Sequence, residues 1–148
     1  MATMILQPDE QERSLFMSIR KEMGIENTKD IIQQVTSVLH AFRQTLSLPD
    51  ANKVLNKLPD LLKMIFVSNW RQHEQPVMVN HLDEFVNLVM IRDRRLKKFI
   101  FKSEVHTLSI IILTLKKLHN LIDLSHLDGI STCLQQELNE VNTEGVLA

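Results

Sequence analysis

Histidine and acidic residues gather most densely between residues 73 and 84, where they could hold a metal ion. The candidate ligands are His73, Glu74, His81, Asp83 and Glu84. No two histidines of the chain lie three or four residues apart, which is the spacing that aims two imidazoles at one metal from a helix. We therefore predict no metal and no cofactor. The alternative is a loop whose ligands converge in space.

Nucleophilic catalysis has one thiol candidate, Cys133, which is the only cysteine. It falls at an apolar position of an expected helix, where a cysteine usually acts as a small hydrophobic side chain. The chain contains no G-x-S-x-G, H-E-x-x-H or P-loop string. We predict no catalytic residue, and the alternative is an enzyme whose groups converge from distant segments.

The segment from Arg92 to Lys102 is the most unusual in charge. It has six basic residues against Asp93 alone, so its net charge is +5, whereas the whole chain carries −1. One interpretation is a solvated helix face paired with acids elsewhere. The other is a surface for an anionic partner: an acidic protein, a nucleic acid or a membrane. The basic residues are Arg92, Arg94, Arg95, Lys97, Lys98 and Lys102.

Apolar residues recur every three to four positions along the chain, and strand alternation is missing, so we predict an all-α protein. Its 148 residues suit one domain, 1–148, of about six or seven helices. In the helix from Ser103 to Ile122, we place Val105 and Leu108 on the buried side. The predicted helices cover residues 8–23, 27–46, 47–58, 59–70, 80–91, 103–122 and 125–141.

Residues at the expected helix ends support these bounds. Gly24 can end the N-terminal helix in a left-handed conformation. Ser47 can cap the third helix, and Pro59 disfavours helical geometry at Leu58, so we expect a break there. Trp70, the lone tryptophan, is expected to cover the core, with a ligand-stacking platform as the alternative.

Two stretches of the chain resemble each other as pairs of a long and a short helix. We place the first unit at about 28–91 and the second at about 103–141. Such a repeat predicts two units that bury their apolar faces against one another. Chance similarity is the alternative, because helical periodicity alone produces much of the match.

A motif in the first unit is similar to a known family pattern. The stretch 58–66, LPDLLKMIF, is followed by Trp70 and then by Glu84-Phe85. It resembles the bacterial family called domain of unknown function 2267, over roughly Thr28 to Val89. The resemblance implies an all-helical bacterial protein without a membrane segment, and it implies no activity.

Function is predicted largely by elimination. The most apolar stretch falls short of the roughly 20 residues that a membrane span requires, and the start of the chain has no basic region of a secretory signal. We therefore expect a cytoplasmic protein. A helical chain without converging chemistry favours a non-enzymatic protein that associates with itself or with another protein. A nucleic-acid partner is less favoured, because the pI is near 6.6.

Overall fold

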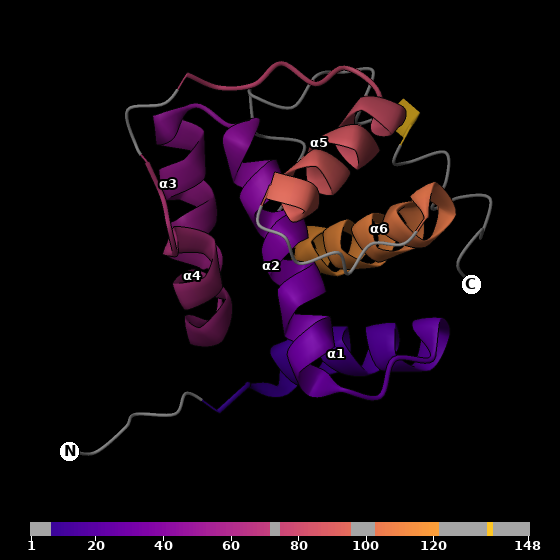
Figure 1. Ribbon diagram of the computed structural model, residues 1–148. Helices are drawn as coiled ribbons and strands as arrows, with labels where there is room; N and C mark the ends of the chain where they lie inside the picture. Colours follow the sequence, from indigo (N-terminus) through magenta and orange to yellow (C-terminus); the bar gives the residue numbers. More distant parts are fainter. Residues whose placement is uncertain (1–6, 72–74, 96–102, 122–135, 138–148) are drawn as a thin grey trace.

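The computed structural model describes residues 7–71, 75–95, 103–121 and 136–137. Helices α1 to α6 lie in this part of the chain and are labelled in Figure 1. The described residues contain no strand, so the all-α prediction is confirmed. Gln136 and Glu137 are helical and lie inside the predicted last helix, whose other residues are outside the described ranges. The helices are α1 (Glu10–Met23), α2 (Thr28–Gln44), α3 (Leu48–Lys57), α4 (Asp60–Val67), α5 (Leu82–Arg95) and α6 (Glu104–Leu121).

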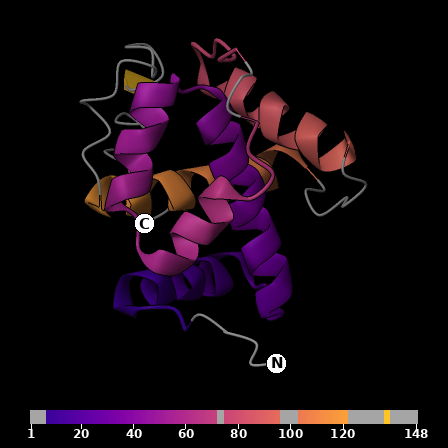
Figure 2. The ribbon, with the colours of Figure 1, turned by 90° about the vertical axis from the view of Figure 1, so that its left-hand side faces the viewer.

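Helix α2 is the centre of the fold. It contacts α1, α4, α5 and α6, and Figures 1 and 2 show the α3–α4 pair on one side of it and α5 on the other. Its apolar stripe explains this position, because Ile31, Val35, Val38 and Leu39 are almost completely buried. Phe66 and Phe85 bring aromatic rings into the same core from α4 and α5.

Local capping residues fix the end of α1 and the start of α3 as the sequence predicts, but the start of α1 differs. Gly24 ends α1 with a left-handed backbone at φ 65°. The Ser47 hydroxyl accepts a hydrogen bond from the Asp50 N–H and so caps α3. Helix α1 begins at Glu10 and not at Pro8, because Asp9 is its N-cap and forms a capping box with Glu12.

Helix α4 is shorter than predicted. Leu58 is extended before Pro59, as expected, but the helix ends at Val67 and not near Trp70. Ser68 is extended and Asn69 has a positive φ of 54°. Periodicity could not show this end, because side chains of α2 bind the carbonyl groups that the early ending leaves free, as described below.

The buried side of α6 differs from the prediction at its first turn. Leu108 is half-buried, but Val105 is 76% exposed, so the placement of Val105 on the buried side is wrong. Further along, every residue from Ile110 to Leu115 is buried, because α1, α2 and α5 all contact this helix. None of the helices in the described ranges is both long and apolar enough to cross a membrane.

Candidate functional site

The acidic and histidine residues near the start of α5 mainly hold that helix end. The Oε1 atom of Glu84 accepts hydrogen bonds from the N–H groups of Asn80 and His81, at 3.3 and 3.0 Å. The Oδ1 atom of Asp83 accepts one from the N–H of Glu84 at 2.9 Å. These contacts satisfy amide groups that a helix N-terminus leaves free. His73, another predicted ligand, lies outside the described residues, as does Glu74.

His81 is the histidine of this group that meets a distant carboxylate. Its Nδ1 atom lies 2.7 Å from Oε1 of Glu137, whose Oε2 accepts a hydrogen bond from the Leu82 N–H at 2.6 Å. The hydrogen bond to Glu137 raises the pKa of His81, and the same contact lowers the pKa of Glu137. Among the described residues, no three His, Cys, Asp or Glu side chains come together to hold a metal.

The basic segment is described only in part. Arg92 is half-buried, and its Nη2 atom lies 2.9 Å from Nδ1 of His40. Asp93 is buried, whereas Arg94 is exposed on α5. Arg92 therefore directs its guanidinium group into the protein. The side chain of Arg95 and the residues Lys97, Lys98 and Lys102 lie outside the described ranges.

His40, Arg43 and Arg92 form a buried basic cluster at the C-terminal end of α4. The Nη1 atom of Arg43 donates to the carbonyl oxygens of Phe66 and Ser68 at 2.5 and 2.9 Å. The Nη2 atom of Arg43 lies 3.4 Å from the carbonyl oxygen of Asn69. The Nε2 atom of His40 lies 2.8 Å from the Ile65 oxygen. The cluster therefore supplies donors and positive charge where the helix dipole is negative.

The environment of His40 keeps its ring neutral. Burial lowers the pKa of His40 to about 4, and the guanidinium groups of Arg43 and Arg92 act in the same direction. The hydrogen bond to the Ile65 carbonyl opposes them. A neutral ring that donates from Nε2 leaves Nδ1 free to accept from Arg92, which matches the observed contacts. The geometry is that of a structural clamp.

Glu12 binds a free backbone group at the N-terminal end of α4. Its side chain is 1% exposed, and its Oε2 atom accepts a hydrogen bond from the Leu62 N–H at 2.8 Å. Pro59, the N-cap of α4, provides no side-chain hydrogen bond. A carboxylate from α1 therefore satisfies the first turn of α4, while α2 and α5 supply the cluster at its last turn.

Trp70 follows α4 and covers part of the core, as predicted. It is half-buried, and its ring meets Phe66 edge to face, with 5.8 Å between centroids. The Arg43 guanidinium carbon lies 5.8 Å from the centroid of the tryptophan ring, within reach of a cation–π interaction. These contacts are with the protein's own side chains, so they account for the tryptophan without a ligand.

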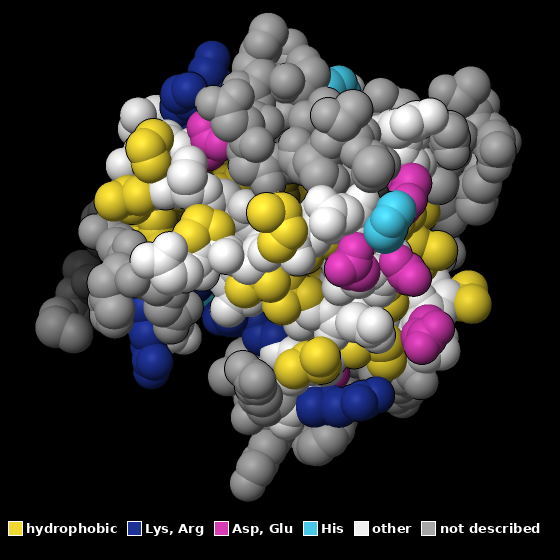
Figure 3. All heavy atoms as spheres, turned by 90° about the horizontal axis from the view of Figure 1, so that it is seen from above, with side chains coloured by type: hydrophobic (Ala, Val, Ile, Leu, Met, Phe, Trp, Pro, Cys, Tyr) yellow, Lys and Arg dark blue, Asp and Glu magenta, His cyan; other side chains and the backbone are white. Residues whose placement is uncertain are grey.

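An open groove lies between the first turns of α5 and α6, and we call it the α5–α6 groove. It has a volume of about 380 Å³, and its apolar lining consists of Leu82, Val86, Val105 and Leu108. Asp83, Asn87 and Glu104 provide the polar lining. Figure 3 shows apolar side chains on this face of the molecule with acidic side chains beside them. The groove combines exposed apolar surface with negative charge.

Comparison with known proteins places the chain in a family. The model of an uncharacterised conserved family, DUF2267, matches residues 13–141. The chain belongs to this family. No curated protein matches it. The match confirms the resemblance that the motif at residues 58–66 indicates.

The DUF2267 motif has a structural explanation in this chain. Leu58 and Phe66 are buried on either side of the break at Pro59. Phe85 is fully buried in α5, and Trp70 packs on Phe66. Apart from Met64, which is 56% exposed, the apolar positions of the motif serve the packing of the core around α4 and α5.

Proposed function

We propose that this chain is a non-enzymatic interaction domain that binds a basic amphipathic helix of another protein in the α5–α6 groove. The observation that carries the proposal is Val105, which is 76% exposed beside an apolar floor. Full burial of a valine side chain stabilises a complex by about 1.5 kcal/mol or more. An amphipathic helix in an apolar groove is a common recognition mode.

The apolar lining supports binding through hydrophobic contact. Val86 and Leu108 form part of the floor, and Leu82 belongs to the core at one end. The floor is therefore held by the folded protein, so little ordering is required when a partner binds. Apolar side chains three and four residues apart on a partner helix would match such a narrow groove.

Charge at the rim supports a basic partner. Asp83 and Glu104 line the groove, and both are exposed at the first turns of their helices. Glu84 is an exposed neighbour of Asp83. Carboxylates around an apolar floor favour lysine or arginine beside the apolar face of a partner, and they disfavour an acidic one.

The test uses a fluorescein-labelled amphipathic peptide built from leucine and lysine. Fluorescence anisotropy measures its binding to the folded protein and to Val105→Ser. We expect the substitution to weaken binding by about tenfold, which corresponds to the loss of one buried apolar contact. Met17→Ser is the matched control, because Met17 is also exposed but lies on α1.

Three outcomes would contradict the proposal. Equal weakening by Val105→Ser and Met17→Ser would show that the peptide binds apolar surface without preference. A dimer in light scattering that Val105→Ser dissociates would replace the basic partner with a second copy as the occupant. We expect no binding of a leucine–glutamate peptide, and binding of that peptide would contradict the role of the acidic rim.

The anionic-partner alternative has one described residue in its favour, the exposed Arg94. We propose that Arg94→Glu combined with Lys98→Glu weakens binding to heparin at low salt. Heparin binding that both changes leave intact would remove the anionic-partner alternative.

We also propose that the domain consists of two similar units, about 28–91 and about 103–141, and that it acts in the cytoplasm.

A further inference from the structure

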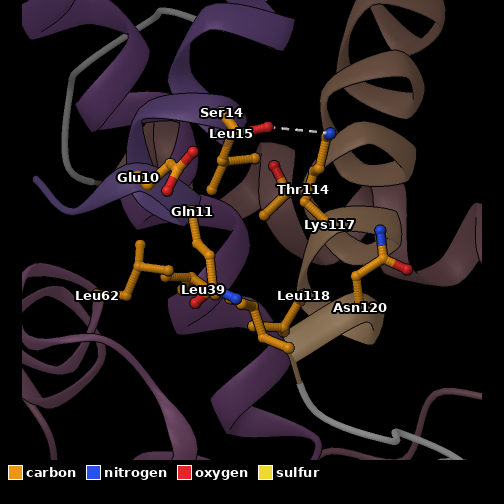
Figure 4. Close-up of a pocket in the computed structure, with 11 residues that line it drawn as sticks. Glu10, Gln11, Ser14, Leu15, Leu39, Leu62, Thr114, Lys117, Leu118 and Asn120 are labelled. Atoms are coloured by element: carbon orange, nitrogen blue, oxygen red, sulfur yellow. Dashed lines mark hydrogen bonds between the residues drawn. The ribbon is translucent and has the colours of Figure 1, made fainter.

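A second cavity lies on another part of the molecule, between α1 and the C-terminal half of α6 (Figure 4). Its volume is about 320 Å³. A cavity of roughly 150 Å³ is enough to bind benzene, so this pocket can hold a small aliphatic molecule. It shares no lining residue with the α5–α6 groove.

Leucines from four helices form the apolar part of this pocket. They are Leu15 of α1, Leu39 of α2, Leu62 of α4, and Leu118 and Leu121 of α6. The first four of these side chains are at most 5% exposed, so the lining belongs to the packed core. A rigid apolar lining of this size is typical of sites for small ligands.

The polar part of the pocket centres on Lys117. Figure 4 shows its amine beside Ser14, and the Nζ atom donates a hydrogen bond to Oγ of Ser14 at 3.2 Å. Lys117 is half-buried and forms no ion pair among the described residues, whereas Glu10 on the same rim is exposed. The ammonium group lies at the exposed rim above the leucine lining, where it favours an anionic head group on an aliphatic ligand.

Thr114 provides a second, independent sign of an incomplete site. It lines the pocket one turn before Lys117, is 1% exposed, and its hydroxyl has no hydrogen-bond partner. Elsewhere in the helices, the hydroxyls of Thr36 and Thr107 donate to the carbonyl oxygens four residues earlier. Buried hydroxyls usually find such a partner, so Thr114 leaves an unmet hydrogen bond in the pocket wall.

We propose that this pocket binds a medium-chain aliphatic carboxylate. The hydrocarbon tail lies on the leucine lining, and the carboxylate accepts hydrogen bonds from the amine of Lys117. The side-chain amide of Asn120, which also lines the pocket, provides a further donor at the same end of α6. The site is separate from the proposed protein-binding groove and does not depend on it.

Isothermal titration calorimetry with octanoate, octylamine and octanol tests the proposal. We expect octanoate to bind the unmodified protein at least about tenfold more tightly than octylamine, since one charge-assisted hydrogen bond carries that much affinity. Lys117→Gln removes this preference but leaves octanol binding in place. Lys116→Gln is the matched control, because Lys116 is the exposed neighbour on the same helix.

Two further variants keep the test decisive. Lys117→Arg retains the positive charge and must preserve the preference for octanoate. Val105→Ser, which weakens the proposed groove, must leave octanoate binding unchanged. The proposal is overturned if octanoate and octylamine bind equally to the unmodified protein, or if Lys117→Gln and Lys116→Gln bind octanoate equally well while melting curves show both folded.

Discussion

Two histidines of this protein contact charged side chains, and their pKa values shift in opposite directions. His40 is buried between α2 and α4, and burial together with Arg43 and Arg92 lowers its pKa to about 4. His81 is exposed before α5, and the carboxylate of Glu137 raises its pKa. Burial and the sign of the neighbouring charge, rather than the residue type, therefore decide which histidine carries a proton.

The surroundings of these two histidines also show two ways to satisfy the free backbone groups at a helix end. At α4, side chains from α1 and α2 reach across the fold to backbone groups, and Arg92 of α5 contacts the ring of His40 beside them. At the start of α5, Glu84 accepts from nearby amides, and Glu137 reaches the same helix end from a distant part of the chain. The buried arrangement joins several helices, and so we expect its loss to affect the whole fold, whereas loss of the exposed one affects a single turn.

The largest expected effect is that of Arg43→Met. Methionine keeps the apolar packing of the arginine stem but removes the donors to the carbonyls of Phe66 and Ser68. We expect a loss of about 4 kcal/mol in the free energy of unfolding, because buried acceptors lose charged donors. Urea denaturation measures it, with the exposed Arg94→Met as control. A loss below about 1 kcal/mol would contradict the role of Arg43 as a clamp.

The second effect is a pH dependence that comes from His40. Its pKa is about 4 in the folded protein, whereas the ordinary value of a histidine is near 6.5, so the unfolded chain binds the proton first as the pH falls. The free energy of unfolding should decrease by about 3 kcal/mol between these two values and then level off. Thermal unfolding of His40→Gln across this range should show a shallower slope, and an unchanged slope would refute the assignment.

The smallest effect is expected at the exposed pair. His81 has a raised pKa in the folded protein, so its contribution to stability is complete below the ordinary histidine pKa and is lost as the pH rises through the raised value. The melting temperature of the unmodified protein should therefore decrease slightly as the pH rises through the raised pKa of His81. In His81→Ala this decrease should be smaller. The decrease should also disappear in high salt, because an exposed pair is screened. A decrease that persists in salt points to another group.

Much of the fold could be predicted from local residues. Apolar periodicity gives α2, and Gly24 and Ser47 mark ends that depend only on neighbouring atoms. Two predictions fail where tertiary contacts decide. Helix α4 stops at Val67 because distant donors satisfy its carbonyls, and Val105 is exposed although it continues the apolar stripe of α6. The second failure points to the proposed binding groove.

The basic cluster could not be predicted, since its members are up to 52 residues apart. One signal was present: His40 and Arg43 interrupt the apolar stripe of α2 at helical spacing. Basic side chains on the buried side of a helix require acceptors. Only the crossing of α2 with α4 shows that those acceptors are backbone carbonyls.

The reach of Glu12 to α4 bears on how this protein can be shortened. The DUF2267 match begins at residue 13, so a chain trimmed to the matched region would lose the carboxylate that holds the Leu62 N–H. The new terminus would also begin inside α1 and leave its capping box behind. For expression or crystallisation, the useful boundary is therefore upstream of Asp9, a few residues before the point at which sequence similarity fades.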